Sequence, residues 1–359
     1  MKQRITPRTL LSRFLVALLL AGSAYVFWLQ IGDVPLRNIY SLIADMGPSI
    51  ALILLPFGVV MFFDVLGWRH CITDERVLPL RRLFAIRLST DAVMNTLPAG
   101  VAVAEPLRSV LLRDVLGLRM TDAVGATILA KINLAIAQFL FILTGVGLVL
   151  LHARQHEGSA MLLDAAGGWT SVLPVSVLAL GLLALPYSGP RLSQLLRLLA
   201  SIPLRPLRRG LARIDEAVRS IDSYVGTFAR EHRSRFVTSL LLFTWSWLFM
   251  AAETWLILQL LGADISMTQA IVFEGVASIV RLMFFFLPAG IGAQDVSFVA
   301  MLQASGIPEA AVIAVAFVLL RRGKELLWNG GGLLLLAWLR VGRLRRRDDG
   351  LALSPEAAT

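Results

Sequence analysis

Long apolar stretches alternate with short polar segments along most of the chain. Apolar runs cover residues 14–31, 46–68, 132–151, 169–186 and 236–261. Each approaches or exceeds the roughly 20 residues that cross the hydrocarbon core of a bilayer as a helix. None alternates apolar and polar residues with a period of two, which is the pattern of a membrane β-barrel. The pattern therefore predicts an all-α fold, a polytopic membrane helix bundle, and the mean hydropathy of +0.74 argues against a soluble domain.

The basic residues indicate how the helices are oriented. They lie before residue 14, at 69–87, at 188–235 and after residue 339. Because Lys and Arg flank membrane spans on the cytoplasmic side, these segments and both termini are expected in the cytoplasm. Threading the chain accordingly gives helices at about 10–31, 46–68, 121–151, 168–187 and 236–262, and one long or broken helix at about 308–340. The first is expected to be an uncleaved helix, because its apolar run continues to Trp28.

The tetrapeptide Leu-Pro-Ala-Gly occurs twice, at 97–100 and at 287–290. Pro98 and Pro288 each remove a backbone donor, and Gly100 and Gly290 allow a reversal that a continuous helix does not. Under the orientation above, the segment 83–117 begins and ends inside, whereas 268–305 begins and ends outside. Each segment is therefore expected to be a broken re-entrant helical hairpin.

The two hairpins predict inverted repeats, about 46–151 and about 236–340, joined by a cytoplasmic amphipathic connector at about 188–235. Residues 1–343 then form a single transmembrane domain, and 344–359 a disordered cytoplasmic tail. Discontinuous helices in inverted repeats are typical of transporters and mark the binding site. The alternative is a chance match of four common residues, although the same offset also aligns Glu105 with Asp295 and Lys131 with Arg321.

Charged residues recur inside the apolar segments, where each costs about 2.5 to 3.5 kcal/mol to insert. An Arg can bind a phosphate through two donors, and a half-helix that starts after each break presents amides to an anion. Arg108 also fits a side chain that extends to the membrane surface. Glu105 and Asp295 are expected to hold the nearby cations when no lipid is bound. The candidate substrate-binding residues bracket or follow the breaks: Glu105, Arg108, Lys131, Arg281, Asp295 and Arg321.

Other chemistry has little support in the sequence. A single cysteine, Cys71, and four His residues show no metal-ligand spacing, so neither a metal nor a cofactor is expected. No nucleophile and base pair is visible, and we do not expect an enzyme. The net charge of +10 follows from the membrane flanks, and without a stacking platform it does not indicate nucleic acid.

Three stretches resemble a known family: "FFDVLGWRHCI", "NTLPAGVAVAEPLRSVLLRD" and "FFFLPAGIGAQDVSFVAML". They are similar to the transmembrane region of lysylphosphatidylglycerol synthases and its stand-alone flippase-like relatives, over about residues 10–343. The resemblance implies paired re-entrant segments and the handling of lipids in the inner membrane. Relatives often carry Gly where Val101 and Ala102 or Ala104 stand, and Glu where Asp295 stands, so the match is imperfect. About a dozen residues follow the last helix, so the soluble aminoacyltransferase domain of full-length synthases is not expected.

These observations favour a lipid translocase or lipid-handling protein of the inner (plasma) membrane that acts on an anionic or otherwise polar headgroup. The alternative is a secondary transporter of a small solute, driven by protonation of Glu105 or Asp295. A membrane enzyme and a scaffold without a substrate also stay open. The expected partners are membrane lipids, a lipid-biosynthesis enzyme and further copies of the chain in an oligomer.

Overall fold

The fold is a bundle of helices, of which the computed structural model describes residues 36–74, 78–97, 100–153, 219, 222–284, 287 and 290–352. Its helices are α2 (Leu36–Asp45), η1 (Gly47–Ile53), α3 (Leu54–His70), α4 (Leu80–Thr96), α5 (Val101–Leu116), α6 (Met120–Ala153), α11 (Arg233–Leu260), α12 (Met267–Met283), α13 (Ala293–Ala304) and α14 (Ala310–Ala352). No strand occurs among these residues, which confirms the all-α prediction. The predicted helices at 10–31 and 168–187, most of the connector at 188–235, and the two prolines of the breaks lie outside the described residues.

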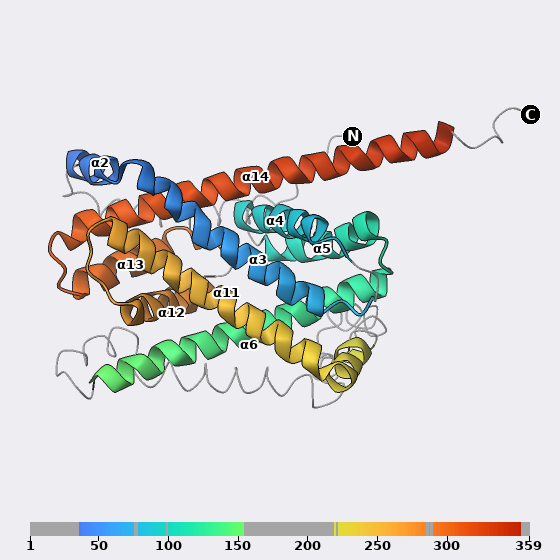
Figure 1. Ribbon diagram of the computed structural model, residues 1–359, viewed down its shortest axis with the longest axis horizontal. Helices are drawn as coiled ribbons and strands as arrows, with labels where there is room; N and C mark the ends of the chain where they lie inside the picture. Colours follow the sequence, from blue (N-terminus) through green and yellow to red (C-terminus); the bar gives the residue numbers. More distant parts are fainter. Residues whose placement is uncertain are drawn as a thin grey trace, which may run out of the picture.

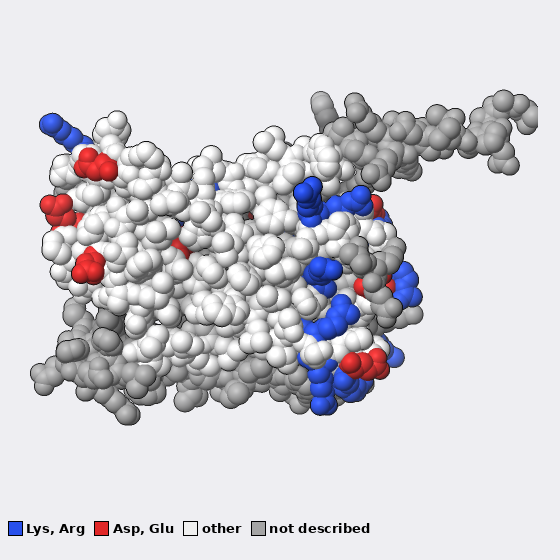
Figure 2. Space-filling view, in the orientation of Figure 1, with Lys and Arg blue, Asp and Glu red and all other residues white. Residues whose placement is uncertain are grey.

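Three helical segments are long and apolar enough to cross a membrane: Gly47–His70, Met120–Leu148 and Arg233–Leu260. They coincide with the predicted helices at 46–68, 121–151 and 236–262. Figure 2 shows that Lys and Arg gather at one end of the molecule, with a broad, almost uncharged band between the two ends. We refer to this end as the basic end. The charge pattern therefore fits a bundle that is embedded by its middle.

The two halves of the described chain contain the same order of elements. In each half a long helix is followed by two short helices and a second long helix: α3, α4, α5 and α6 in the first, and α11, α12, α13 and α14 in the second. The helices α3 and α11 pack along each other and run in opposite directions at the centre of the bundle (Figure 1). Around them, α4 packs against α14, and α12 packs against α6. The inverted-repeat relation between the halves stays a prediction.

The four helices that flank the breaks are short. They contain 17 (α4), 16 (α5), 17 (α12) and 12 (α13) residues. At 1.5 Å per residue, none is longer than about 26 Å. In Figure 1 the pair α4–α5 lies toward the basic end, and the pair α12–α13 lies toward the opposite end. These lengths suit helices that enter a hydrocarbon core of about 30 Å only partway.

The last helix is one continuous element rather than a broken one. It runs from Ala310 to Ala352 and therefore extends into the stretch 344–359, for which the sequence predicts disorder. Adding a residue to an existing helix is much easier than nucleating a new one, so a packed helix can continue into a polar tail. Residues 353–359 lie outside the described part of the chain.

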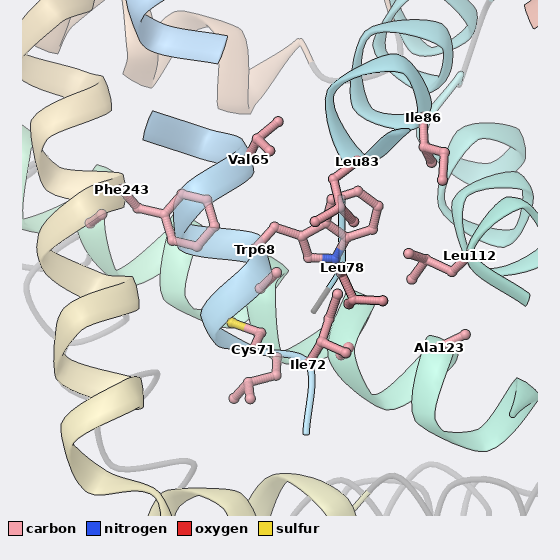
Figure 3. Close-up of a cluster of buried hydrophobic side chains, with 14 of the residues drawn as sticks. Val65, Trp68, Cys71, Ile72, Leu78, Leu83, Ile86, Leu112, Ala123 and Phe243 are labelled. Atoms are coloured by element: carbon pink, nitrogen blue, oxygen red, sulfur yellow. The ribbon is translucent and has the colours of Figure 1, made fainter. Parts of the chain in front are cut away.

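One of the two apolar cores lies where α3 meets α4, α5, α6 and α11. Figure 3 shows Trp68, near the C-terminal end of α3, and Cys71, directly after this helix, between Phe243 of α11 and Leu83 of α4. Gly67 permits this approach, because a Cβ there would lie 3.1 Å from the Phe243 ring. The Cys71 side chain is fully buried, and its Sγ lies 3.2 Å from the hydroxyl of Ser239 on α11.

We expect a maleimide to leave Cys71 unlabelled in the folded protein and to label it fully in denaturant. The thiolate is the reactive form, and burial raises the pKa of the Cys71 thiol to about 12. A Cys71→Ala variant that also carries Arg82→Cys, at an exposed position, supplies the control and should react rapidly while folded. Rapid labelling of Cys71 in the native state would show that the contact between α3 and α11 is open.

Candidate functional site

The first Leu-Pro-Ala-Gly break joins α4 to α5 at a close backbone approach. The Leu97 amide donates to the Val93 carbonyl at 3.2 Å and closes the last turn of α4. The Gly100 amide then donates to the Leu97 carbonyl at 3.0 Å. A Cβ on Gly100 would lie 2.1 Å from the Met94 carbonyl oxygen. Only glycine therefore lets the chain turn back this tightly.

Six charged side chains gather beside this hairpin, and we call them the first charge cluster. They are Asp64 on α3, Arg87 and Asp91 on α4, Glu105 and Arg108 on α5, and Lys131 on α6. Arg87 pairs with Asp91 and, at 2.6 Å, with Asp64. Lys131 Nζ lies 2.8 Å from Glu105 Oε1. Acids and bases balance within the cluster, so it carries no net formal charge.

Arg108 connects the members of the first charge cluster. It donates through Nη1 to Glu105 and through Nη2 to Asp91, both at 3.0 Å, and through Nε to the Thr90 hydroxyl at 3.1 Å. Its guanidinium also lies over the Trp68 ring, 5.6 Å from the centroid. The residue is only 5% exposed, so its side chain does not extend to the membrane surface.

The second break uses its glycines differently. Gly290 has φ of +63° and Gly292 has φ of +85°, backbone conformations that are costly for residues with a Cβ. The chain then enters α13, where the Asp295 carboxylate accepts a hydrogen bond from the Gly292 amide at 2.9 Å. Glycine is therefore required at the first break because the backbone passes too close for a Cβ, and at the second break because two positions have left-handed backbone.

Eight charged side chains form the second charge cluster around the α12–α13 hairpin. They are Glu253 on α11, Glu274 and Arg281 on α12, Asp295 on α13, and Arg321, Arg322, Lys324 and Glu325 on α14. As in the first cluster, acids and bases balance. Most of these side chains are buried, so each charge requires a partner.

The deepest pair of this cluster joins Arg321 to Glu274. Arg321 is 4% exposed and Glu274 is fully buried. The Thr254 hydroxyl donates to Glu274 at 2.5 Å and accepts from Arg321 at 3.2 Å. The guanidinium also lies 4.7 Å from the centroid of the Phe298 ring. Arg321 is thus fully engaged by the protein itself.

The remaining pairs tie α14 to α13 and α11. Arg322 binds Asp295 through Nε at 3.0 Å and Nη2 at 2.7 Å, and binds Glu325 through Nη1 at 2.5 Å. Lys324 pairs with Glu253, and its ammonium lies 4.6 Å from the centroid of the Phe57 ring. Arg321, Arg322 and Lys324 of α14 therefore reach three different helices, α12, α13 and α11.

Two buried donors beside the second break have no hydrogen-bond partner within the described part of the chain. They are Arg281 Nε and Gln294 Nε2. A Cβ built on Gly290 would lie 3.4 Å from the Gln294 side chain and 3.7 Å from Arg281 Cγ, so the two side chains flank this glycine. A buried donor without an acceptor costs about 1 to 3 kcal/mol. An anion held beside Gly290 would supply the acceptor.

Helix α14 carries polar side chains from the second cluster to the first break. Arg322 and Glu325 are followed one turn later by Asn329, which accepts a hydrogen bond from Asn95 at 3.3 Å. Asn95 lies in the last turn of α4, just before the first break. The two breaks are therefore joined by a polar stripe on one helix.

The structure brings the predicted residues into two separate groups. Glu105, Arg108 and Lys131 lie in the first cluster, and Arg281, Asp295 and Arg321 in the second. Glu105 holds Lys131, as expected. Asp295 instead holds Arg322, because Arg321 lies about 100° away around α14 and faces Glu274.

Eight members of the two clusters were not among the predicted site residues: Asp64, Arg87, Asp91, Glu253, Glu274, Arg322, Lys324 and Glu325. Each has its ion-pair partner on another helix or one turn away. The available signal was a charge inside an apolar run, as for Asp64 and Glu253. Among the described residues, no group of three or more His, Cys, Asp or Glu could hold a metal ion.

Comparison with protein families gives one match that covers most of the chain. The model of the lysylphosphatidylglycerol synthase TM region matches residues 14–326, a stretch that contains both breaks and both charge clusters. A comparison with curated proteins gives no match. The matched region ends at Leu326, one residue after Glu325, so it includes all the α14 members of the second charge cluster.

Proposed function

We propose that this chain, which belongs to the lysylphosphatidylglycerol synthase TM region family, is a lipid translocase for an anionic headgroup. The family match supports a membrane protein with a lipid-related function. The observation that carries the finer proposal is the pair of neutral charge clusters at two helix breaks, which are joined by the polar stripe of α14. Such a path gives a headgroup polar partners while the acyl chains stay in the bilayer.

The headgroup would move by exchanging partners. A lipid phosphate can replace a carboxylate as the acceptor of an Arg, because both bind the guanidinium through two oxygens. The free donors at Arg281 and Gln294 offer the first contact, and opening the Asp295–Arg322 pair would extend the site toward α14. Each cluster is neutral without substrate, so the protein does not trap the anion permanently.

We place the chain in a bacterial-type inner membrane, with the basic end in the cytoplasm, because Lys and Arg are retained on that side. In this orientation α4–α5 enters from the cytoplasm and α12–α13 from outside. We also propose that the chain has no enzymatic role and that a lipid-biosynthesis enzyme supplies its substrate. A proton-coupled carrier for small solutes is less favoured, since Glu105 and Asp295 are both engaged in ion pairs with cations of the protein.

The test is transport of a fluorescent anionic phospholipid across proteoliposomes by the Arg281→Gln variant. We expect a loss of roughly tenfold or more in rate, the equivalent of about 1.4 kcal/mol. Arg281 Nε has no hydrogen-bond partner to lose within the described residues, so the expected cost in stability is about 0.5 to 2 kcal/mol, from the contact of the guanidinium with the Trp247 ring. Arg37→Gln, at an exposed position on α2 and outside both charge clusters, is the matched control and should transport like the parent protein.

The two variants must be compared at equal protein density and with their thermal unfolding measured in parallel. Equal transport by Arg281→Gln and the parent protein would contradict the headgroup site at the second break. Equal transport of a zwitterionic lipid by the parent protein and Arg281→Gln, alongside a loss for the anionic lipid, would assign the arginine to recognition of headgroup charge.

A further inference from the structure

A groove of about 600 Å³ lies along α14 and is lined by apolar side chains from three elements. Its lining residues are Leu54, Leu88, Leu327, Trp328, Gly331, Leu334, Leu335 and Trp338. None of them carries a charge, and Leu327, Leu334 and Trp338 are strongly exposed. In a chain of a membrane-protein family, the medium that meets such a surface is the acyl region of the bilayer.

Three consecutive glycines of α14 show how the groove is formed. A Cβ on Gly331 would meet nothing within 4 Å, so the missing side chain leaves the groove open at this position. Gly330 is exposed, has equally open surroundings and does not line the groove. Gly332 is buried, and its Cβ would lie 2.5 Å from the Leu88 carbonyl oxygen. Of the three glycines, Gly331 therefore keeps the groove open, Gly332 allows α14 to pack against α4, and Gly330 does neither.

The dimensions of the groove match one leaflet. From Trp328 to Trp338, α14 rises about 15 Å, which is half of a hydrocarbon core of about 30 Å. The α14 residues that line the groove run from Leu327, close to Asn329 where the polar stripe meets the first break, to Trp338. In Figure 1, α14 runs in this direction toward the basic end. Trp338 at its far end is 69% exposed, as is usual for a Trp near the membrane surface.

Basic residues lie where the groove approaches the basic end of the molecule. The contacts of Asn329 with Asn95 and of Gly332 with Leu88 show that α4 and α14 run antiparallel. Seven residues further on each helix, α4 reaches Arg81 and α14 reaches Leu339, next to Trp338. Arg81 and Arg82 are both exposed. Cations at this level attract anionic headgroups.

We propose that this groove binds one acyl chain of an anionic lipid in the leaflet at the basic end, with the headgroup beside Arg81 and Arg82. The inference deepens the proposed function and rests on it for the lipid being a substrate. The acyl chain of the bound lipid then lies beside the polar stripe of α14, which leads to the first break. The groove thus selects a lipid anion rather than a soluble anion.

The test uses phosphatidylglycerol with a diazirine on one acyl chain, incorporated into nanodiscs with the full chain. After photolysis, the label on the peptides of α14 is compared with the label on the exposed apolar face of α11 around Leu241 and Trp245, which serves as the reference for ordinary lipid contact. We expect several-fold more label on residues 327–338 of the parent protein than on the reference face, and competition by unlabelled phosphatidylglycerol.

Gly331→Leu should fill the groove and reduce the label on α14 to the level of the reference face. Gly330→Leu should label like the parent protein, and both variants should fold, because replacing Gly by Leu raises helix propensity. Equal labelling of Gly331→Leu and the parent protein, or no excess over the reference face, would overturn the groove site. Because labelling is measured without transport, it can fail or succeed independently of the translocase assay.

Discussion

Replacing Arg321 by Gln is expected to lower the free energy of unfolding by about 3 to 5 kcal/mol, the usual cost of breaking a buried ion pair. Glu274 is fully buried and would keep its charge with only the Thr254 hydroxyl as a close donor. Glu274→Gln should be similarly destabilising, because it leaves the 4% exposed Arg321 without its main partner. Thermal or denaturant unfolding in detergent measures both effects.

The double variant Arg321→Gln with Glu274→Gln should be more stable than either single variant, since no uncompensated charge remains. Arg82→Gln removes an exposed charge and should stay close to the parent protein. If Arg321→Gln unfolds at the same denaturant concentration as the parent protein, Glu274 must find another cation, and the pair is not what holds α12 to α14.

The stability cost changes how transport data on this residue are to be interpreted. Arg321 is one of the residues that the sequence selects for a headgroup, yet all its described contacts are to the protein. A loss of transport in Arg321→Gln would therefore reflect misfolding as readily as a lost contact with lipid. Arg281 separates the two explanations, because its Nε donor is not used by the described residues.

The helices and their breaks could be predicted because the bilayer imposes length and polarity on the sequence. A span needs about 20 apolar residues, and a proline followed by glycine inside such a segment interrupts it. The runs at 46–68 and 236–261 therefore gave positions close to those of α3 and α11, and both Leu-Pro-Ala-Gly segments fall between helices, α4 and α5 in the first case and α12 and α13 in the second. That these helix pairs are re-entrant stays a prediction. The family resemblance was predicted from the same segments and is confirmed by the family match.

The partners within the site could not be predicted in the same way. Which of two adjacent cations meets Asp295 depends on the rotation of α14, and a shift of one residue turns a side chain by about 100°. Asp295 consequently binds Arg322, although the repeat aligns Asp295 with Glu105 and Arg321 with Lys131, the cation that Glu105 binds. Asp64 and Glu253 lie far in sequence from the breaks, and only tertiary packing brings them to Arg87 and Lys324.

Substitution of Gly100 by Ala is expected to be among the most damaging single changes in the chain. The added Cβ would lie 2.1 Å from the Met94 carbonyl oxygen and 2.8 Å from its Cα. Both atoms belong to the backbone, so the contact cannot be relieved by a side-chain rotation, and the turn itself must open. We expect a loss of about 3 kcal/mol or more in stability, together with loss of transport, because the two helices that this turn joins carry four of the six members of the first charge cluster.

The corresponding change at the second break has a different cause and a smaller effect. At Gly290 an added Cβ meets side-chain atoms no closer than 3.4 Å, so the cost comes from φ of +63° and is about 1 to 2 kcal/mol. Gly290→Asn should cost less than Gly290→Ala, since Asn tolerates left-handed backbone, whereas Gly100→Asn should be as damaging as Gly100→Ala. Gly275→Ala, within α12 and with nothing near its Cβ, is the control and should be neutral or slightly stabilising. Unfolding midpoints that rank Gly100→Ala with Gly275→Ala would mean that the two helices at the first break do not approach as closely as described.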